Sequence, residues 1–216
     1  MSPRVADPAV RTTLIEAAAR LLATEGPDAL TLRRLAEDAG TSTMAIYTHF
    51  GGMTELRREV RREGFARLAA HLSAPDRTLD AVEDVAILGW AYFTNALANP
   101  NLYRAMFMEP GIDEDDGAIG IDTFETLVDA VRRCIDAGRF HAADAAAVAT
   151  QLWALTHGIV TLHLAGFLPV SRAAQALLDA TRNLFVGYGD HRRRVTRSLG
   201  RAASRAEAVD RPGVQA

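Results

Sequence analysis

Small, hydroxyl-bearing and aromatic side chains gather within residues 42–49 of this 216-residue chain. Hydroxyl groups can bond base edges or phosphate oxygens, and methyl groups can contact thymine. A helix that presents such side chains on one face can lie deep in the major groove of DNA. The candidate contacts in this segment are Ser42, Thr43, Ala45, Tyr47, Thr48 and His49.

A second polar group, at residues 31–34, precedes this segment. Thr31 can cap a short helix that starts after it, because a threonine hydroxyl can accept from the free amides of the first turn. Arg33 and Arg34 can reach a phosphate or a guanine edge. We include Thr31 and Arg33 among the candidate DNA contacts.

The elements that position these residues are short helices. Helical periodicity starts at Asp7-Pro8 and stops at Gly26-Pro27, and two more helices are expected over 32–39 and 43–50. Gly40 between them tolerates the left-handed conformation common after a helix. With Leu35 and Ile46 facing inward, this spacing predicts a helix-turn-helix.

The rest of the chain is also predicted to be helical, over 54–72, 79–98, 100–108, 121–136, 142–168 and 171–188. No strand alternation is found, so the expected fold class is all-α. We expect a DNA-binding domain over 1–52 and a larger helical effector-binding and dimerisation domain over 53–189. Residues 190–216 are arginine-rich and are expected to form a frayed or disordered tail.

Composition narrows the class of protein. The chain is 49% hydrophobic with a net charge of −3, which argues against disorder throughout. Its single cysteine, Cys134, excludes an intramolecular disulfide framework and a cysteine-based zinc cluster. No apolar stretch reaches the ~18–20 residues of a membrane span, and no signal peptide is apparent. We therefore expect a cytoplasmic protein with no membrane partner, metal or cofactor.

The charges are unevenly distributed. Residues 1–72 carry +1, residues 73–190 carry −9 and residues 191–216 carry +5, and the chain contains no lysine. A basic domain is the usual mark of nucleic-acid binding. Any DNA contact must therefore depend on a local surface and not on the charge of the whole chain.

The segment Gly40-Thr41-Ser42-Thr43-Met44-Ala45-Ile46-Tyr47-Thr48-His49-Phe50 resembles the recognition segment of the TetR family of transcriptional regulators. Gly26 and Thr31-Leu32-Arg33-Arg34-Leu35-Ala36 also fit that pattern, which covers roughly residues 10–57. The resemblance implies an all-α homodimer that usually represses until a small molecule binds its C-terminal domain.

The same resemblance implies individual roles. Tyr47 and His49 match positions that contact phosphates, Thr43 and Ala45 match positions that read bases, and Arg33 matches one that can do either. Met53 departs from the family pattern, which usually has a lysine there, so a phosphate contact is either missing or replaced by Arg57 or Arg58.

Residues Asn99–Phe107, together with Trp153 and His157-Gly158, resemble the WHG-type C-terminal domain of some TetR-like regulators. A cavity between helices is the expected site of a small apolar effector. Its candidate lining residues are Trp90, Phe93, Tyr103, Met106, Phe107, Phe124, Trp153 and His157. The helices over 142–168 and 171–188 are apolar on more than one side, so we expect them to form the homodimer interface.

Two other functions remain open. An all-α enzyme could use His157 or His163 as a general base, although neither has a carboxylate at helical spacing and no nucleophile motif is found. A helical adaptor could bind a protein partner and never touch DNA.

Several other signals have simpler explanations. The acidic run at 113–116 lacks the spaced ligands of a calcium loop. His157 and His163 face opposite ways and make a poor metal pair. Cys134 is expected in the core. The arginines over 192–197 are expected to solubilise a tail rather than to make a second DNA contact.

Overall fold

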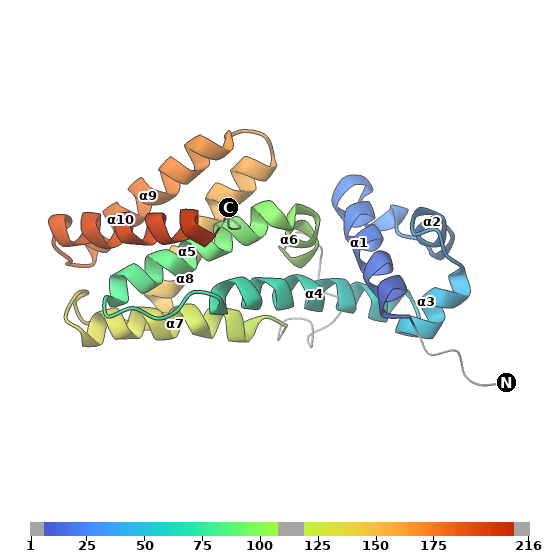
Figure 1. Ribbon diagram of the computed structural model, residues 1–216, viewed down its shortest axis with the longest axis horizontal. Helices are drawn as coiled ribbons and strands as arrows, with labels where there is room; N and C mark the ends of the chain where they lie inside the picture. The colour runs from blue at the N-terminus through green and yellow to red at the C-terminus, as the bar shows by residue number, and fades with distance from the viewer. Residues whose placement is uncertain (1–6, 108–118, 210–216) are drawn as a thin grey trace, which may run out of the picture. The chain divides into compact units, whose positions relative to one another are not determined.

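A computed structural model describes the backbone of residues 7–107 and 119–209, and all the regular structure in these ranges is helical (Figure 1). The acidic run at 113–116 falls outside the described residues. The described chain divides into two compact units: Met1–Arg67 with Ala98–Ile121, and Leu68–Leu97 with Asp122–Ala216. We call them unit 1 and unit 2.

Unit 1 contains the predicted helix-turn-helix. Its elements are α1 (Pro8–Glu25), a 3-10 turn η1 (Pro27–Ala29), α2 (Leu32–Asp38), α3 (Thr43–Phe50), most of α4 (Met53–Ser73) and α6 (Pro100–Phe107). Asp7 caps α1 by accepting a hydrogen bond from the amide of Ala9, and Pro8 follows it as predicted. The sequence analysis did not predict η1.

One apolar core holds unit 1 together. Leu14, Leu35 and Ile46 are fully buried and join α1, α2 and α3. Leu56 of α4 and Leu102 of α6 belong to the same core. α6 packs closely on α1 and belongs to unit 1, which therefore includes residues beyond the expected DNA-binding domain over 1–52.

Unit 2 is a helical bundle. It contains α5 (Ala81–Ala98), α7 (Ile121–Asp136), α8 (Ala145–Leu164), α9 (Val170–Gly187) and α10 (Arg192–Val209), together with the end of α4. Its core includes Val82 from α5, Val131 from α7, Ala149 from α8, Phe185 from α9 and Leu199 from α10. α8 is long and apolar enough to cross a membrane by length and composition alone, a test that core helices of soluble proteins also pass.

The structure contradicts the expectation of a disordered tail over 190–216. Residues 192–209 form α10, and residues 210–216 lie outside the described part. Val195, Leu199 and Ala202 recur at helical spacing and are buried against unit 2. This stripe is narrow and lies among six arginines, so composition alone suggested a solvated tail.

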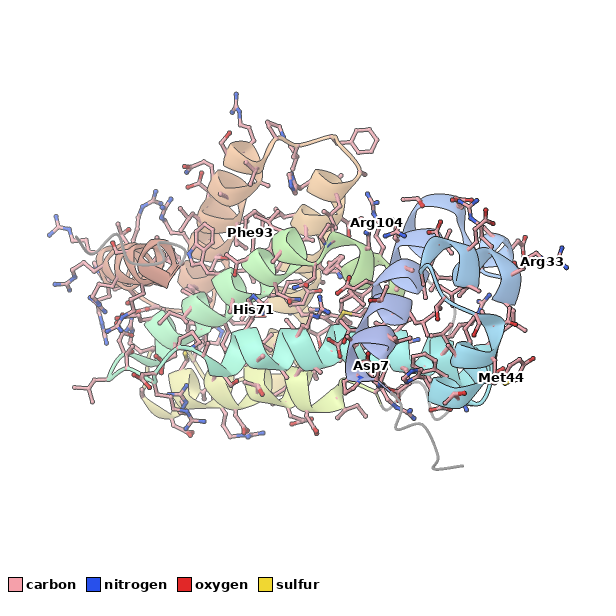
Figure 2. All side chains as sticks on the ribbon, turned by 45° about the vertical axis from the view of Figure 1, so that its right-hand side comes forward. Asp7, Arg33, Met44, His71, Phe93 and Arg104 are labelled. Atoms are coloured by element: carbon pink, nitrogen blue, oxygen red, sulfur yellow. The ribbon has the colours of Figure 1, made fainter. Side chains whose placement is uncertain are left out.

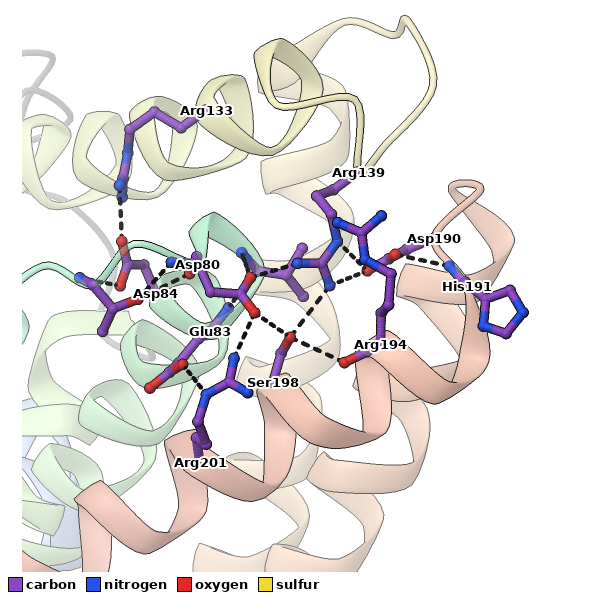
Figure 3. Close-up of polar contacts among 12 residues, drawn as sticks. Asp80, Glu83, Asp84, Arg133, Arg139, Asp190, His191, Arg194, Ser198 and Arg201 are labelled. Carbon is purple, nitrogen blue, oxygen red and sulfur yellow. Dashed lines mark hydrogen bonds and ion pairs between the residues drawn. The ribbon is translucent and has the colours of Figure 1, made fainter.

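Ion pairs attach α10 to the start of α5 (Figure 3). Arg139 is buried and binds Asp190 at 2.5 Å and Asp80 at 2.6 Å. Ser198 donates to Asp80 at 2.6 Å, and Arg201 pairs with Glu83 at 2.5 Å. Because these residues come from distant parts of the chain, sequence spacing could not reveal the network.

Candidate nucleic-acid interface and effector site

Two caps and one glycine shape the turn between α2 and α3. The Thr31 hydroxyl accepts from the amide of Arg34, and the Ser42 hydroxyl accepts from the amide of Ala45, both at 3.3 Å. Gly40 has a φ of 62°, the left-handed region that favours glycine. Short helices depend on such caps, since their first amides have no partner within the helix. The turn is therefore built as the sequence predicted.

The buried face of α3 fixes which side chains point outward. Ile46 and Phe50 are buried in the unit 1 core. Thr43, Tyr47 and Thr48 are exposed, and Tyr47 keeps half of its surface. Ala45 and His49 lie at the edges of this surface. The structure thus gathers the predicted contacts of α3 on one side, with Ser42 at its N-terminal end.

Met44 also belongs to this exposed face, and the sequence analysis missed it. Its side chain is 69% exposed and points away from the ribbon (Figure 2). Met44 lies three and four residues before Tyr47 and Thr48, so helical spacing alone would have placed it beside them. A flexible thioether at this place can contact thymine methyl groups.

The hydroxyl groups differ in what they already bind. Thr31 and Ser42 accept from backbone amides, and the Thr48 hydroxyl donates to the carbonyl of Met44 at 2.9 Å. The side chains of Thr43 and Tyr47 make no hydrogen bond to another described residue. Thr43 and Tyr47 are therefore the hydroxyls most available to a nucleic acid.

The arginines of unit 1 are mostly paired, and Arg33 is an exception. Arg34 pairs with Glu25 at 3.1 Å, Arg58 pairs with Glu55 at 3.4 Å, and Arg57 donates to the carbonyl of Pro27 at 2.8 Å. Arg33 is exposed, extends into solvent in Figure 2, and pairs with none of the described residues. Its guanidinium can approach a phosphate without first breaking an ion pair.

Met53, where the TetR pattern usually has lysine, begins α4 and packs against the unit 1 core. Arg57 and Arg58, the suggested substitutes, are both bonded within unit 1. A phosphate contact from either would require it to leave its present partner.

In unit 2, five of the predicted effector residues make ring contacts, in one pair and one set of three, and we call these five the aromatic group. The rings of Trp90 and Phe93 lie 5.8 Å apart, those of Phe124 and Trp153 lie 6.0 Å apart, and those of Trp153 and His157 lie 5.9 Å apart. Such separations are typical of favourable ring contacts.

Tyr92 joins this group and was not singled out in the sequence. Its hydroxyl lies 3.0 Å from Nδ1 of His157 and accepts from the indole nitrogen of Trp153 at 3.3 Å. Burial lowers the pKa of His157, because removing water disfavours the charged imidazole. The sequence offered no separate signal for Tyr92, since an aromatic residue on an apolar helix is usually plain core.

The other three predicted effector residues lie in unit 1. Tyr103 and Met106 are fully buried in α6, and the Phe107 ring lies 5.0 Å from that of Tyr103 and 5.6 Å from that of Phe65. Gly64 is tightly packed, because a Cβ atom there would overlap the Met106 side chain. Tyr103 and Met106 are thus packed within unit 1, and Phe107 contacts Tyr103 and Phe65 there.

Comparison with known proteins agrees with this geometry. Residues 14–60 match the profile of bacterial regulatory proteins of the tetR family, and residues 85–184 match the tetracyclin repressor-like C-terminal domain. Together the two profiles cover more than half of the chain. The chain belongs to the TetR family of transcriptional regulators.

Individual relatives of this TetR regulator support the family assignment. An uncharacterised HTH-type transcriptional regulator of Mycobacterium tuberculosis, Rv0681, is 28% identical over 157 residues, which are 72% of this chain and 71% of the relative. A solved Rhodococcus sp. RHA1 protein with unknown function is 28% identical, with a TM-score of 0.72 over 88% of this chain and all of the other. The TetR family regulator PfmR of Thermus thermophilus shares the fold, at 21% identity, a TM-score of 0.67, and 82% and 99% coverage.

The family assignment fixes the broad function. TetR proteins are DNA-binding transcriptional regulators with a ligand-binding C-terminal domain, and they are not a family of enzymes. In this TetR regulator the DNA-binding profile spans α2 and α3, and the C-terminal profile spans the aromatic group of unit 2.

Proposed function

We propose that this TetR regulator acts in the cytoplasm as a homodimeric repressor that binds a palindromic operator and is released by a small apolar effector. The observation that carries the proposal is the exposed face of α3. There the side chains of Thr43 and Tyr47 are exposed and bond to no described residue, and Arg33 of α2 is also exposed and unpaired among the described residues.

The proposed contacts divide into two kinds. Tyr47, His49 and Arg33 would hold phosphates, which positions the protein without reading the sequence. Thr43, Ala45 and Thr48 would meet base edges, where small side chains allow a close approach. Thr31 and Ser42 would act mainly by holding the ends of α2 and α3, since both hydroxyls accept from backbone amides.

An exposed apolar surface on α8, α9 and the turn between them supports the dimer. Leu162, Phe167 and Val170 are 46%, 77% and 48% exposed. Gly158 lies one turn before Leu162 on α8, and a Cβ atom there would have nothing within 4 Å, which leaves room for a neighbouring helix. Soluble monomers rarely expose such a patch. A two-fold dimer through this surface would present two recognition helices to a palindrome, with half-sites one helical turn or more apart.

The aromatic group of unit 2 supports an apolar effector. Trp90 contacts Phe93, and Trp153 contacts Phe124 and His157, so two sets of rings supply apolar surface of the kind that ligand sites use. Effector binding would release DNA by favouring a subunit arrangement with the wrong spacing, and a coupling of ~1–3 kcal/mol changes affinity about 5–150-fold. The WHG-type subgroup remains part of this proposal.

The enzyme alternative finds little support in the histidines. Nδ1 of His157 faces the hydroxyl of Tyr92, and Nδ1 of His163 lies 2.9 Å from the carbonyl oxygen of Leu168. Neither partner is a carboxylate, which would orient an imidazole as a general base. An exposed α3 surface could serve a DNA-binding regulator or a protein-binding adaptor. Only a measurement of DNA binding distinguishes these two functions.

The test is a gel-shift titration of the full-length protein with DNA from upstream of its own coding region. A salt-dependent shift that is lost with a scrambled fragment of equal length would support the proposal. Equal affinity for both fragments, or no shift at low salt, would exclude it. Light scattering at micromolar concentration should give the mass of a dimer.

A further inference from the structure

The buried face of α5 has a gap at Gly89. At about 100° per residue, Gly89 points between Val82, Val85, Phe93 and Ala96. Those four side chains are at most 3% exposed. Yet a Cβ atom placed on Gly89 would have no heavy atom within 4 Å, and Gly89 itself is partly exposed. A core position normally touches several other residues, so unit 2 has unfilled space in the middle of its most buried helix face.

Several aromatic side chains of unit 2 keep accessible surface. Trp90 follows Gly89 and is half-buried, as are Phe124 and His157, and Trp153 keeps 37% of its surface. A second aromatic pair in unit 2, Phe140 and Phe185, is 2% and 0% exposed with rings 5.2 Å apart. Unit 2 can therefore bury rings fully, whereas Trp90, Phe124 and Trp153 retain open surface.

One end of the gap carries uncharged hydrogen-bonding groups. Tyr92 lies one turn after Gly89 on the same face of α5. The Tyr92 oxygen accepts from the indole N–H of Trp153 and shares a second hydrogen bond with Nδ1 of His157, so the Tyr92 hydroxyl links these two side chains. Burial lowers the pKa of His157, so this ring is neutral near pH 7.

The buried charged side chains of unit 2 are already bound in ion pairs. Among the described residues these are Glu83, Asp84, Arg139 and Asp190, and each has an ion-pair partner in the network of Figure 3. Glu83 and Asp84 also point about 120–140° around α5 from Gly89. A charged group bound at Tyr92 would thus find no buried counter-charge, and burying an unpaired charge is unfavourable.

We propose that the gap at Gly89 binds an apolar molecule with one uncharged hydrogen-bonding group, such as an alcohol or a ketone, and that this group lies at Tyr92 and His157. The inference rests on the proposed function and names the chemical class of its effector. The apolar part fills the space at Gly89 beside Phe93 and Trp90. Tyr92 and His157 select neutral over charged head groups.

Intrinsic fluorescence can test this directly, because Trp90 and Trp153 are the two tryptophans of the chain. The full-length protein is titrated at pH 7.5 with 1-decanol, decanoate or decylamine, each below its aggregation concentration. We expect a saturable change with decanol and at least tenfold weaker binding of both charged probes. No saturable change with decanol, or equal binding of decanoate or decylamine, would overturn the proposal.

Two variants locate the site. Gly89→Leu fills the gap and should weaken decanol binding more than tenfold, with Tm unchanged or raised because leucine is the better helix former. Gly200→Leu is the matched control, since Gly200 is an exposed mid-helix glycine of α10 that also has nothing within 4 Å of its Cβ position. Tyr92→Phe should weaken decanol binding several-fold. A Tm several degrees lower for Gly89→Leu would show that no gap exists, and unchanged decanol binding in both Gly89→Leu and Tyr92→Phe would equally overturn the site.

A parallel measurement separates this inference from the proposed function. Anisotropy of labelled upstream DNA is followed with and without decanol. If the protein binds its upstream DNA selectively but does not bind decanol, the inference about the effector is overturned and the proposed DNA-binding function is unaffected. If Gly89→Leu abolishes decanol binding but decanol does not change DNA affinity, the binding site is supported. In that case the proposed release of DNA by an effector at this site is wrong.

Discussion

Thr43 and Tyr47 lie one helical turn apart on the exposed face of α3, while Ile46 beside Tyr47 is fully buried. Packing of Ile46 against Leu14 and Leu35 in the unit 1 core fixes the rotation of α3. Neither hydroxyl group bonds to another described residue. The direction in which Thr43 and Tyr47 point is therefore set by the packing of α3 on the core.

Removing these two hydroxyls should weaken operator binding without unfolding unit 1. A hydrogen bond contributes about 0.5–1.5 kcal/mol, so Tyr47→Phe should raise the dissociation constant of the dimer, with two copies of the change, by about tenfold. Thr43→Ala should in addition reduce the preference for the operator over scrambled DNA. Thr24→Ala on α1 is a matched control, because its exposed hydroxyl bonds only the carbonyl of Arg20. Wild-type affinity in both α3 variants would show that another face meets DNA.

The buried pair Arg139–Asp190 should matter more to stability than any surface pair. Removing one partner leaves an uncompensated buried charge, which typically costs about 3–5 kcal/mol. Arg139→Met should therefore lower the free energy of unfolding in urea by about that amount. Adding Asp190→Leu to the same chain should recover much of the loss. A cost under about 1 kcal/mol for Arg139→Met would mean that the pair is hydrated in solution.

Acid should loosen the attachment of α10 through Asp80. Burial by itself would raise the pKa of this carboxyl, but the hydrogen bond from Ser198, the charge of Arg139 and two backbone amides outweigh it, so the pKa lies below its ordinary value of 3.8. A lowered folded-state pKa contributes stability that is present above 3.8 and is lost as pH falls through the folded value. Wild type should exceed Asp80→Asn in unfolding free energy at pH 5–7, and the two should converge below about pH 4. A constant difference down to pH 3 would contradict this.

The apolar surface of α8 and α9 should be needed for the dimer. Leu162→Glu places a charge on the proposed interface and should convert the protein to a monomer in light scattering, with operator affinity reduced about 100-fold or more. Leu79→Glu is the control, since Leu79 is fully exposed in the segment before α5. Its variant should remain a dimer. A dimeric Leu162→Glu protein would move the interface elsewhere.

Local signals in the sequence were sufficient for unit 1. Caps, glycines and spacing over a few residues define α2 and α3, and the predicted helix over 43–50 is confirmed to the residue. The predicted self-paired charges of α4 are confirmed as well, since Arg62 bonds Glu55 and Glu59 at 2.5 and 2.7 Å. These features depend on neighbours in the chain.

Local signals were not sufficient where contacts between distant parts of the chain determine the structure. α10 is held by Asp80 and Arg139, which lie far from it in sequence, so its arginine-rich composition was misleading. Tyr103 and Met106 have the residue types of a ligand pocket, and they are buried in α6 of unit 1. An aromatic type does not say which core a helix joins.

In the proposed dimer, the exposed α3 faces of both subunits contact the same DNA, one in each half-site. The most direct measurement is selection of bound sequences from a random double-stranded DNA pool by the full-length protein, in parallel with the Thr43→Ala and Tyr47→Phe double variant. The wild type should enrich a two-fold symmetric site with half-sites at least ~34–36 Å apart, and the double variant should lose this enrichment. No enriched sequence with the wild type, or the same site enriched by the variant, would contradict it.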